Sequence, residues 1–333
     1  MKLRFAIVGC GQIAARHAVH ITRLGTLVAV CDIIPERADS FSAKYNCSGF
    51  YSLKDMLQGD VEIDVVAVCT PNGLHATHSI ACLQAGSHVL CEKPLATNTN
   101  DARTMIAAAT EAGKNLFVVK QNRYNPPVQE VKKILEKNKL GTIYSFQLNC
   151  FWNRPAKYYE NTWKGSKEMD GGTLFTQFSH FIDMLYWMLG DVDKVKSVIK
   201  NFGHPGIDIE DTGMVIFEMK SGVTGALNYT TNSYNKNLEG SFTIFGEKGT
   251  VKIGGQYLNE LEYQNIENYP VQNLPPSAKA NDYGFYEGSM SNHGKVYENL
   301  LVALKEEDHS MPMAEDGLKT VEIIEMIYKA SVS

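Results

Sequence analysis

Short apolar runs alternate with amphipathic stretches over roughly the first 120 residues of the chain. The runs have the length and bounding turn residues of buried strands, and the stretches between them repeat apolar residues with the period of a helix. This alternation predicts an α/β domain built on a doubly wound parallel sheet. The expected strands are residues 3–8, 27–32, 63–69, 87–92 and 115–120, and two of the expected helices are residues 75–85 and 100–112.

The segment Asn122–Pro127 interrupts this pattern with two prolines and marks a joint between domains. Beyond it, longer strand-like runs follow one another with short turns and little helix between them, which predicts a mostly antiparallel open sheet in an α+β domain. We divide the chain into residues 1–121 and 122–333, with C-terminal helices that pack back on the first domain. The expected strands are residues 142–152, 192–202, 212–220, 223–231, 240–245 and 249–253, the expected helices are residues 128–138, 293–306 and 317–330, and residues 259–282 are expected to form a long surface loop.

The composition is that of a globular protein with no bulk attraction to nucleic acid or membranes. Hydrophobic residues make up 44% and charged residues 21% of the 333 positions, and the net charge is −5. No stretch approaches the ~18 consecutive apolar residues of a membrane span, and Met1–Arg4 runs straight into the first strand without a signal core. We therefore expect a cytoplasmic protein that holds any anionic ligand through local residues.

Metal binding is not expected from the cysteines or histidines. The chain has seven cysteines, none of them in a Cys-x-x-Cys pair, and several fall within expected strands as buried, reduced thiols. His75 and His78 have a helical spacing that a metal ion can use, but no thiolate or carboxylate joins them. They are interpreted as surface histidines of a helix.

The first apolar run ends in Gly-x-Gly-x-x-Ala, which predicts a dinucleotide site in a Rossmann domain. Gly9 allows the tight turn off the strand, Gly11 lets the backbone approach a pyrophosphate, and Ala14 permits close helix packing. The phosphates are expected at the N-terminus of the following helix. Asp32 ends the next strand, where a carboxylate binds the adenosine ribose and repels a 2′-phosphate. The expected cofactor is NAD rather than NADP.

Further segments complete a pattern that covers essentially the whole chain, and the chain resembles the glucose–fructose oxidoreductase/inositol dehydrogenase/MocA-like family. These segments are Cys69–His75, Glu92-Lys93-Pro94, Gly171-Gly172 ahead of His180, Ile209–Thr212 and Ala314–Gly317. The resemblance implies a nicotinamide cofactor on the first domain and a sugar or polyol bound against the open sheet of the second. It also implies a homo-oligomer, a tetramer or a dimer.

The resemblance assigns catalytic roles to Lys93 and His180. Lys93 would hydrogen-bond the substrate hydroxyl and stabilise the developing alkoxide, and a neutral His180 is a suitable base for the hydroxyl proton at pH 7. A lysine desolvated beside a nicotinamide can also act as the base, so both assignments stay open. Asp183, one turn on, either orients the His180 ring or is a solvated or capping acid. The implied cofactor-binding residues are Gly9, Gly11, Gln12, Ile13, Ala14, Asp32, Thr70, Asn72, His75, Glu92, Lys93, Gln121, Trp163 and Lys164.

One departure narrows the subgroup. Most members of the family carry Asp four residues before the histidine, whereas this chain has Thr176, followed by Gln177. The segments Lys120–Asn125, Asn149–Arg154 and Thr176–Asp183 resemble the UDP-N-acetylglucosaminuronate 3-dehydrogenases of the WlbA/WbpB type. That likeness implies oxidation of C3 of a UDP-linked amino-sugar acid in bacterial surface-polysaccharide (O-antigen) synthesis, with NADH reoxidised in place by 2-oxoglutarate.

The segment Phe151–Lys164 mixes aromatic rings with cations, which suits a nucleotide-sugar acid. Aromatic rings stack on uracil, and Arg or Lys binds phosphate or carboxylate oxygens. Two further interpretations remain: the same chemistry on a free sugar or inositol, and a non-catalytic NAD-binding sensor, against which the presence of Lys93 and His180 argues. The expected substrate-binding residues are Lys93, Asn122, Arg123, Trp152, Arg154, Tyr159, Thr176, Gln177 and His180.

Overall fold

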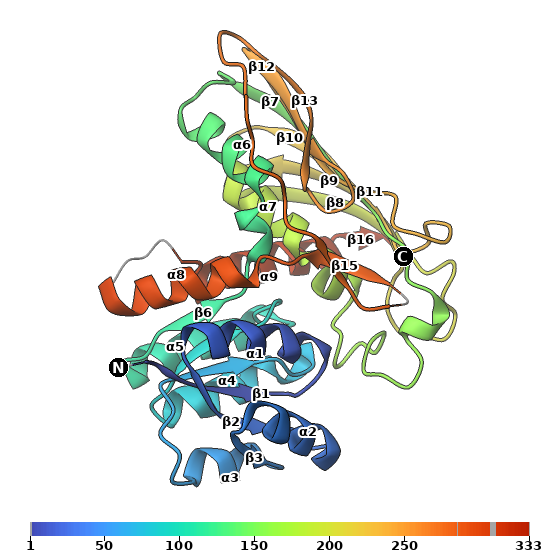
Figure 1. The fold of residues 1–333 in the computed structure, drawn as a ribbon. Coiled ribbons are helices and arrows are strands. Elements are labelled where there is room, and N and C mark those ends of the chain that lie inside the picture. Colours follow the sequence, from blue (N-terminus) through green and yellow to red (C-terminus); the bar gives the residue numbers. More distant parts are fainter. Residues whose placement is uncertain (1, 285, 307–310, 333) are drawn as a thin grey trace. The chain divides into compact units, whose positions relative to one another are not determined.

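The computed structural model describes residues 2–284, 286–306 and 311–332 (Figure 1). The chain divides into two compact units, each made of separate stretches of sequence. The first unit contains residues 1–119, 168–170 and 293–321, and the second contains residues 120–167, 171–292 and 322–333. The segment 293–321 thus belongs to the first unit, although it lies beyond residue 121 in the chain.

The first unit is built on a six-stranded parallel sheet in the order β3-β2-β1-β4-β5-β6. Its central strand residues are almost all buried, as expected for a sheet covered on both faces. The strands are β1 (Arg4–Val8), β2 (Thr26–Cys31), β3 (Ser48–Phe50), β4 (Val65–Val68), β5 (His88–Cys91) and β6 (Leu116–Val118). The helices are α1 (Gln12–Leu24), α2 (Pro35–Tyr45), α3 (Leu53–Gln58), η1 (Asn72–Leu74), α4 (His75–Gln84), α5 (Thr99–Ala112) and α8 (His293–Glu306).

The second unit is built on an eight-stranded sheet in the order β13-β12-β11-β7-β10-β9-β8-β16. Among the described strands, neighbours are antiparallel except in the pairs β7 with β10 and β8 with β16. The strands are β7 (Ile143–Phe151), β8 (Val192–Lys200), β9 (Thr212–Met219), β10 (Thr224–Thr230), β11 (Glu239–Gly246), β12 (Gly249–Gly254), β13 (Glu260–Ile266) and β16 (Ser331–Val332), and β14 (Ala280–Asp282) pairs with β15 (Glu287–Met290). The helices are η2 (Gln121–Tyr124), α6 (Pro126–Glu136), η3 (Ala156–Tyr158), η4 (Leu174–Phe178) and α7 (Ser179–Leu189), and α9 (Ala314–Lys329) begins in the first unit and ends in the second.

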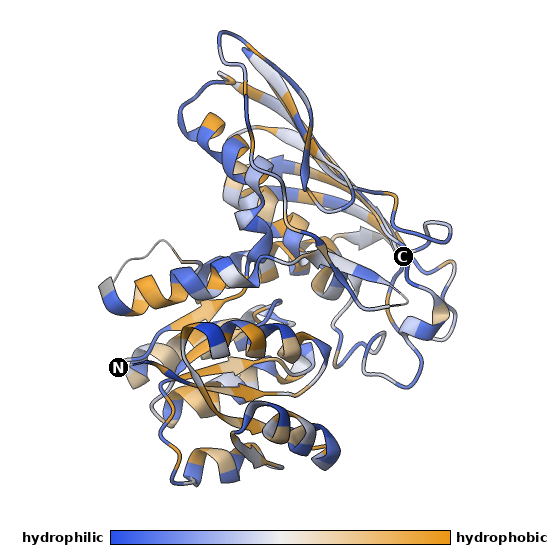
Figure 2. Ribbon diagram, in the orientation of Figure 1, coloured by the Kyte–Doolittle hydropathy of each residue, from blue (hydrophilic) through white to orange (hydrophobic). Residues whose placement is uncertain are grey.

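Hydropathy follows this difference between the two sheets. The central strands of the first sheet are mostly apolar, whereas the strands of the second sheet mix apolar and polar residues (Figure 2). In β7 apolar and polar residues alternate together with burial, whereas in β9 burial alternates but two apolar side chains, Met214 and Ile216, lie on the exposed face. The predicted fold class, a doubly wound parallel sheet followed by a mostly antiparallel one, is confirmed.

Residues 259–282 are not one long loop, and that prediction was wrong. They contain β13, which pairs with β12, and β14. Strand β13 lies at the edge of the sheet and few of its side chains are buried, so its sequence lacks the apolar signal of a core strand. Among the described residues, no helix is long and apolar enough to cross a membrane.

Candidate functional site

The turn after β1 has the geometry that a pyrophosphate requires. Gly9 has φ +89°, and a Cβ there would lie 2.8 Å from the carbonyl oxygen of Cys69, so this position requires glycine. Around Gly11, by contrast, a Cβ would meet nothing within 4 Å, so the backbone is open on that side. Helix α1 starts at Gln12 with no side-chain cap and no acid in its first turn. Its N-terminal N–H groups therefore suit an anionic ligand.

Asp32 is held rigidly at the end of β2. Its Oδ2 accepts a hydrogen bond from the backbone N–H of Cys10 at 2.7 Å, and its Oδ1 accepts one from Ile34 at 2.9 Å. The side chain is only 8% exposed. Each carboxylate oxygen has a second lone pair, so the group can still accept from ribose hydroxyls. The turn and this carboxylate together fit NAD.

The loop between Thr70 and His75 is fixed by its own backbone contacts. His75 Nδ1 lies 2.7 Å from the carbonyl oxygen of Pro94, and Nε2 lies 2.9 Å from that of Thr70. His75 is 1% exposed, so the expectation of a surface histidine was wrong. Burial lowers the pKa of His75, although both carbonyls favour the protonated ring. Asn72 donates from Nδ2 to the carbonyl of Asp170 at 2.9 Å.

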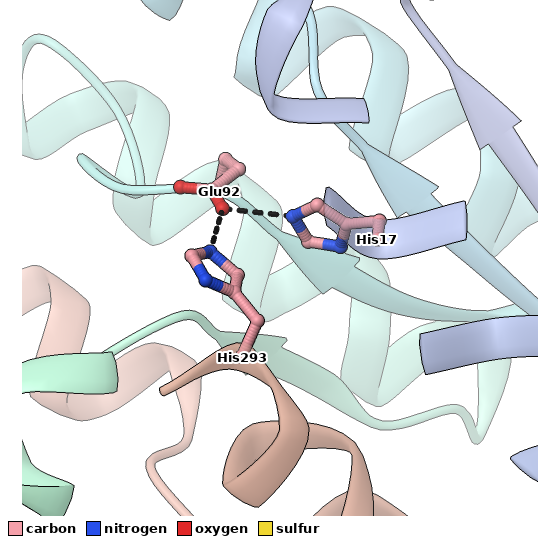
Figure 3. Close-up of side chains that lie close together, drawn as sticks. All are labelled: His17, Glu92 and His293. Atoms are coloured by element: carbon pink, nitrogen blue, oxygen red, sulfur yellow. Dashed lines mark hydrogen bonds and ion pairs between the residues drawn. The ribbon is translucent and has the colours of Figure 1, made fainter. Parts of the chain in front are cut away.

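Glu92 and Lys93 follow β5 at the carboxyl edge of the first sheet. Figure 3 shows the imidazoles of His17 and His293 converging on one carboxylate oxygen of Glu92, with Nε2 to Oε1 distances of 2.8 and 3.2 Å. The other oxygen accepts the backbone N–H of Lys93 at 3.1 Å. Burial alone would raise the pKa of Glu92, but hydrogen bonds from the two histidines hold it well below its usual range.

His17 and His293 were missed by the sequence analysis. They stand 276 positions apart, and only the fold joins them. His17 offered a weak signal, because it lies three residues after Ala14 and so on the same buried face of α1. His293 begins α8 and offered none.

In the second unit, Gln121 contacts His180. The Nε2 of Gln121 lies 3.1 Å from Nε2 of His180 and 3.1 Å from Oγ of Ser289. An amide N–H₂ group only donates, so in this arrangement Nε2 of His180 is the unprotonated, accepting nitrogen. The next residue, Asn122, is fully buried, and within the described part of the chain neither its Oδ1 nor its Nδ2 has a partner. An orphaned buried amide of this kind is an expected contact point for a ligand.

Arg123 and Asp183 are paired with each other. Arg123 donates from Nε and Nη2 to the two oxygens of Asp183, and Lys120 Nζ lies 3.0 Å from the same carboxylate. Burial would raise the pKa of Asp183, but the charges of Arg123 and Lys120 outweigh it and lower the pKa to about 2. Asp183 is therefore not a solvated acid.

Arg154 is a buried cation with neutral partners. It is 2% exposed, donates from Nε to Oε1 of Gln177 at 2.7 Å, and donates from Nη1 to the carbonyl of Asn153 and to Oδ1 of Asn237. Its guanidinium lies over the ring of Trp152. Within the described ranges no hydrogen bond engages Nη2 and no carboxylate pairs with the group, so the charge can accept an acidic ligand.

The other predicted residues of this unit occupy different environments. Trp152 is 2% exposed and donates from Nε1 to the carbonyl of Gln256. Tyr159 is half-buried against His204. The Lys164 ammonium lies 4.0 Å from the centre of the Tyr158 ring. Thr176 and Trp163 are half-buried.

Comparison with known proteins agrees with this geometry. Residues 3–120 match the family model described as "Oxidoreductase family, NAD-binding Rossmann fold", and residues 128–252 match the GFO/IDH/MocA C-terminal domain. The structure is similar to that of the WlbA dehydrogenase from Bordetella pertussis, solved with NADH and UDP-GlcNAcA, with a TM-score of 0.89 and 36% identity over 99% of this chain and 96% of that chain.

Two further relatives extend the comparison. The WlbA dehydrogenase from Chromobacterium violaceum, also solved with NADH and UDP-GlcNAcA, has a TM-score of 0.89 and 37% identity over 99% of this chain and 93% of that chain. The trans-1,2-dihydrobenzene-1,2-diol dehydrogenase of Mus musculus is 28% identical over 340 residues, 99% of this chain and 97% of the mouse protein. NAD is the cofactor that these matches and the fit of the turn support.

Proposed function

The chain belongs to the GFO/IDH/MocA oxidoreductase family, NAD-dependent dehydrogenases of sugar-type hydroxyls, and we propose that it oxidises the C3 hydroxyl of UDP-GlcNAcA to the 3-keto sugar. The observation that carries this proposal is the likeness, at 36% and 37% identity over 99% of the chain, to two dehydrogenases solved with that nucleotide sugar. We place the reaction in the cytoplasm, in the synthesis of bacterial surface polysaccharide.

Most of the groups proposed to hold the cofactor belong to the first unit, and Gln121, Trp163 and Lys164 belong to the second. Gly9 and Gly11 leave room for a pyrophosphate at the start of α1, and Asp32 is fixed where a ribose would be bound. When bound, NAD⁺ supplies the acceptor for the two electrons removed from the substrate carbon. The remaining contacts are proposed for Gln12, Ile13, Ala14, Thr70, Asn72, Glu92, Lys93, Gln121, Trp163 and Lys164, and His75 is proposed to act by shaping its loop.

The acid–base chemistry is proposed for His180 and Lys93. Nε2 of His180 faces a pure donor on Gln121, which favours the neutral ring with a lone pair at that nitrogen. That nitrogen would take the hydroxyl proton as the carbon is oxidised. The Lys93 ammonium would stabilise the negative charge that develops on the oxygen. Glu92 fixes the backbone of Lys93 through its hydrogen bond to the Lys93 N–H.

Recognition of the acidic sugar is proposed for Arg154. Arg123 already donates from Nε and Nη2 to the carboxylate of Asp183, whereas Arg154 has neutral partners and an unengaged Nη2. A carboxylate ligand would accept hydrogen bonds from a buried guanidinium and neutralise its charge. Asn122 is proposed to bind the polar groups of the same substrate, because its buried amide has no partner within the described residues. Gln177 is proposed to orient Arg154. The remaining substrate contacts are proposed for Thr176, Tyr159 and Trp152.

A panel of nucleotide sugars tests the proposal. The purified protein with NAD is expected to remove two hydrogens from UDP-GlcNAcA, seen as a mass loss, and deuterium at C3 should be lost from the product. UDP-N-acetylglucosamine, which lacks only the carboxylate, should react at least a hundredfold more slowly in kcat/KM, a loss of ~3 kcal/mol. Comparable turnover of the two sugars would contradict the proposal that the protein recognises the carboxylate of the substrate. Turnover of free glucose or inositol alone would overturn the assignment of the nucleotide sugar.

Two further features of the proposal have their own readouts. We propose that 2-oxoglutarate reoxidises NADH in place, so substoichiometric NAD should support many turnovers only when that acid is present. We also propose a homotetramer, which light scattering of the purified protein measures directly. A monomer or dimer in solution would contradict the second point and leave the first intact.

A further inference from the structure

We propose that Glu92 holds a buried negative charge at the nicotinamide half of the dinucleotide site and thereby favours binding of NAD⁺ over NADH. The inference concerns a group that touches neither substrate nor a reacting atom, and it rests on the cofactor alone, not on the identity of the sugar. It starts from the three buried side chains in Figure 3.

The hydrogen bonds around Glu92 indicate that both histidines are neutral. Tyr297 Oη lies 2.7 Å from Nδ1 of His17, and the Tyr297 side chain is fully buried. If the Tyr297 hydroxyl donates to Nδ1 of His17, and His17 donates from Nε2 to Glu92, both ring nitrogens of His17 and the hydroxyl hydrogen of Tyr297 have partners. A protonated His17 would instead leave the Tyr297 hydroxyl hydrogen without an acceptor. Burial also lowers the pKa of His17.

His293 leads to the same conclusion. Its Nε2 faces Glu92 at 3.2 Å, whereas its Nδ1 is buried with no partner in the described residues. A proton on that nitrogen would place a charged donor in a buried position with no acceptor, which costs more than an unused lone pair. His293 therefore donates from Nε2 in its neutral form. The hydrogen bonds satisfy the carboxylate without a metal ion, although the three ligand atoms lie within 4.8 Å of one another.

The Lys93 ammonium is the adjacent cation, and it is kept in every variant tested below; the other titratable groups near Glu92 leave the charge of the carboxylate in place. Burial raises the pKa of the thiols of Cys69 and Cys91 and of the hydroxyl of Tyr297, and the negative charge of Glu92 raises the pKa of each further. These groups are neutral at physiological pH. His75 also feels the charge, but burial lowers its pKa. The hydrogen-bond donors to Glu92 are thus two neutral imidazoles and one backbone N–H. Such donors stabilise an anion without cancelling its charge.

The sheet order places this charge on the nicotinamide side. The strand order reverses between β1 and β4, and a doubly wound fold binds one half of a dinucleotide on each side of that point. Asp32 ends β2 and marks the adenosine half, so the other half belongs to the carboxyl ends of β4 and β5. Glu92 directly follows β5. NAD⁺ carries one more positive charge on its nicotinamide ring than NADH, so a fixed anion there stabilises the oxidised form preferentially.

Separate titrations of NAD⁺ and NADH against the full-length protein, without any sugar, test the inference. Glu92→Gln removes the charge, and His293→Lys supplies a cation that neutralises it while keeping the carboxylate. Both variants should raise the ratio of the NAD⁺ to the NADH dissociation constant by about tenfold. Glu92→Asp keeps the charge but shortens the side chain, and Glu298→Gln removes an exposed acid from the same helix as His293. These two should stay within about twofold of the native ratio.

Two results would overturn the inference. The first is an unchanged ratio in folded Glu92→Gln or His293→Lys protein. An equal loss of affinity for both cofactors gives this same unchanged ratio. The second result is the same shift of the ratio in Glu92→Asp, because that would mean that the cluster acts through its packing rather than through its charge. Since no sugar is present, failure of the proposed substrate assignment leaves this measurement unaffected. If Glu92→Gln does not fold, the ratio of dissociation constants measured in His293→Lys still tests the inference.

Discussion

Arg123 and Asp183 form a two-point ion pair, with Nε and Nη2 of the arginine 2.9 and 2.7 Å from the two carboxylate oxygens. Both side chains are buried, and Trp187 covers the guanidinium. The pair engages Nε and Nη2 of Arg123 with a carboxylate of the protein itself. It also connects η2 to α7, the helix that carries His180. Arg123 and Arg154 both stand among the expected substrate-binding residues, and we propose Arg154 as the one that binds the carboxylate.

Replacing Arg154 by Met should lower kcat/KM for the uronate by about a hundredfold, because a carboxylate then loses its buried charged partner. Activity on UDP-N-acetylglucosamine, however slow, should change much less. Steady-state kinetics on both sugars measures the difference. Lys157→Met, an exposed cation of the same segment, is the control. Equal losses on the two sugars would mean that Arg154 only supports the fold.

Replacing Asp183 by Asn should destabilise the protein by about 3–5 kcal/mol, since it leaves the charges of Arg123 and Lys120 buried without a partner. Denaturant unfolding measures the change. Below about pH 2 the native protein should lose the same interaction, because Asp183 becomes protonated there. A loss under 1 kcal/mol in Asp183→Asn would contradict the electrostatic account.

Changing Lys93 or His180 to Ala should each lower turnover by on the order of 10²-fold or more, while NAD binding stays nearly intact. Lys295→Ala replaces an exposed lysine of the first unit and serves as the control. A large loss for Lys93 alone would make the lysine the base. Near-normal rates in both variants would contradict a catalytic role for either residue.

The native protein should prefer NAD to NADP by at least tenfold, about 1.4 kcal/mol, because the carboxylate of Asp32 would face the 2′-phosphate. Titration of both cofactors measures this preference. Asp32→Ala should reduce the preference for NAD over NADP, because NADP should bind more tightly to the variant. Equal affinities in the native protein would contradict the role assigned to Asp32.

Glu210 should make stability depend on pH near neutrality. It accepts hydrogen bonds from Tyr328, Tyr229 and the backbone of Leu174, but burial still raises its pKa from 4.5 to about 7. The folded protein holds this proton more tightly than the unfolded chain. The stabilisation is therefore complete below pH 4.5 and is lost as pH rises through 7, for a total of about 3 kcal/mol.

Unfolding free energies of native protein and Glu210→Gln between pH 4.5 and 8 check this dependence. The difference between the two should shift by about 3 kcal/mol in favour of the variant at high pH. A constant difference across that range would show that Glu210 is ionised throughout.

The sequence specifies five of the six strands of the first sheet well because they are short, mostly apolar and separated by recognisable helices, whereas the edge strand β3, Ser48–Phe50, lacks this apolar signal and was missed. In Val65–Val68 all four side chains are fully buried, and such runs need no tertiary information to be found. Strand β13 is the opposite case. Its pattern is dominated by polar residues at a sheet edge, where pairing with β12 rather than burial defines it.

The candidate site could be predicted only where local geometry imposes a residue type. Gly9 needs its positive φ, and this need is visible in the motif. The partners of a side chain depend on the fold: Arg123 meets Asp183 across 60 positions, and Glu92 meets His293 across 201. Nothing in a single sequence distinguishes such a pair from two unrelated charges. For the same reason, Arg154 could be proposed as a cation but not as one with neutral partners.

The segment Leu174–Phe178 adopts a π-helical turn, in which hydrogen bonds span five residues rather than four, immediately before α7. Such a turn acts as a local insertion in an otherwise α-helical register. Counting four positions back from His180 to Thr176 therefore does not reach the residue that an α-helix would place one turn below the imidazole. An alignment with relatives that lack the wide turn must therefore open a gap inside the helix. Deleting one residue from the segment Leu174–Phe178 should rotate His180 about the helix axis by about 100° relative to the preceding turn.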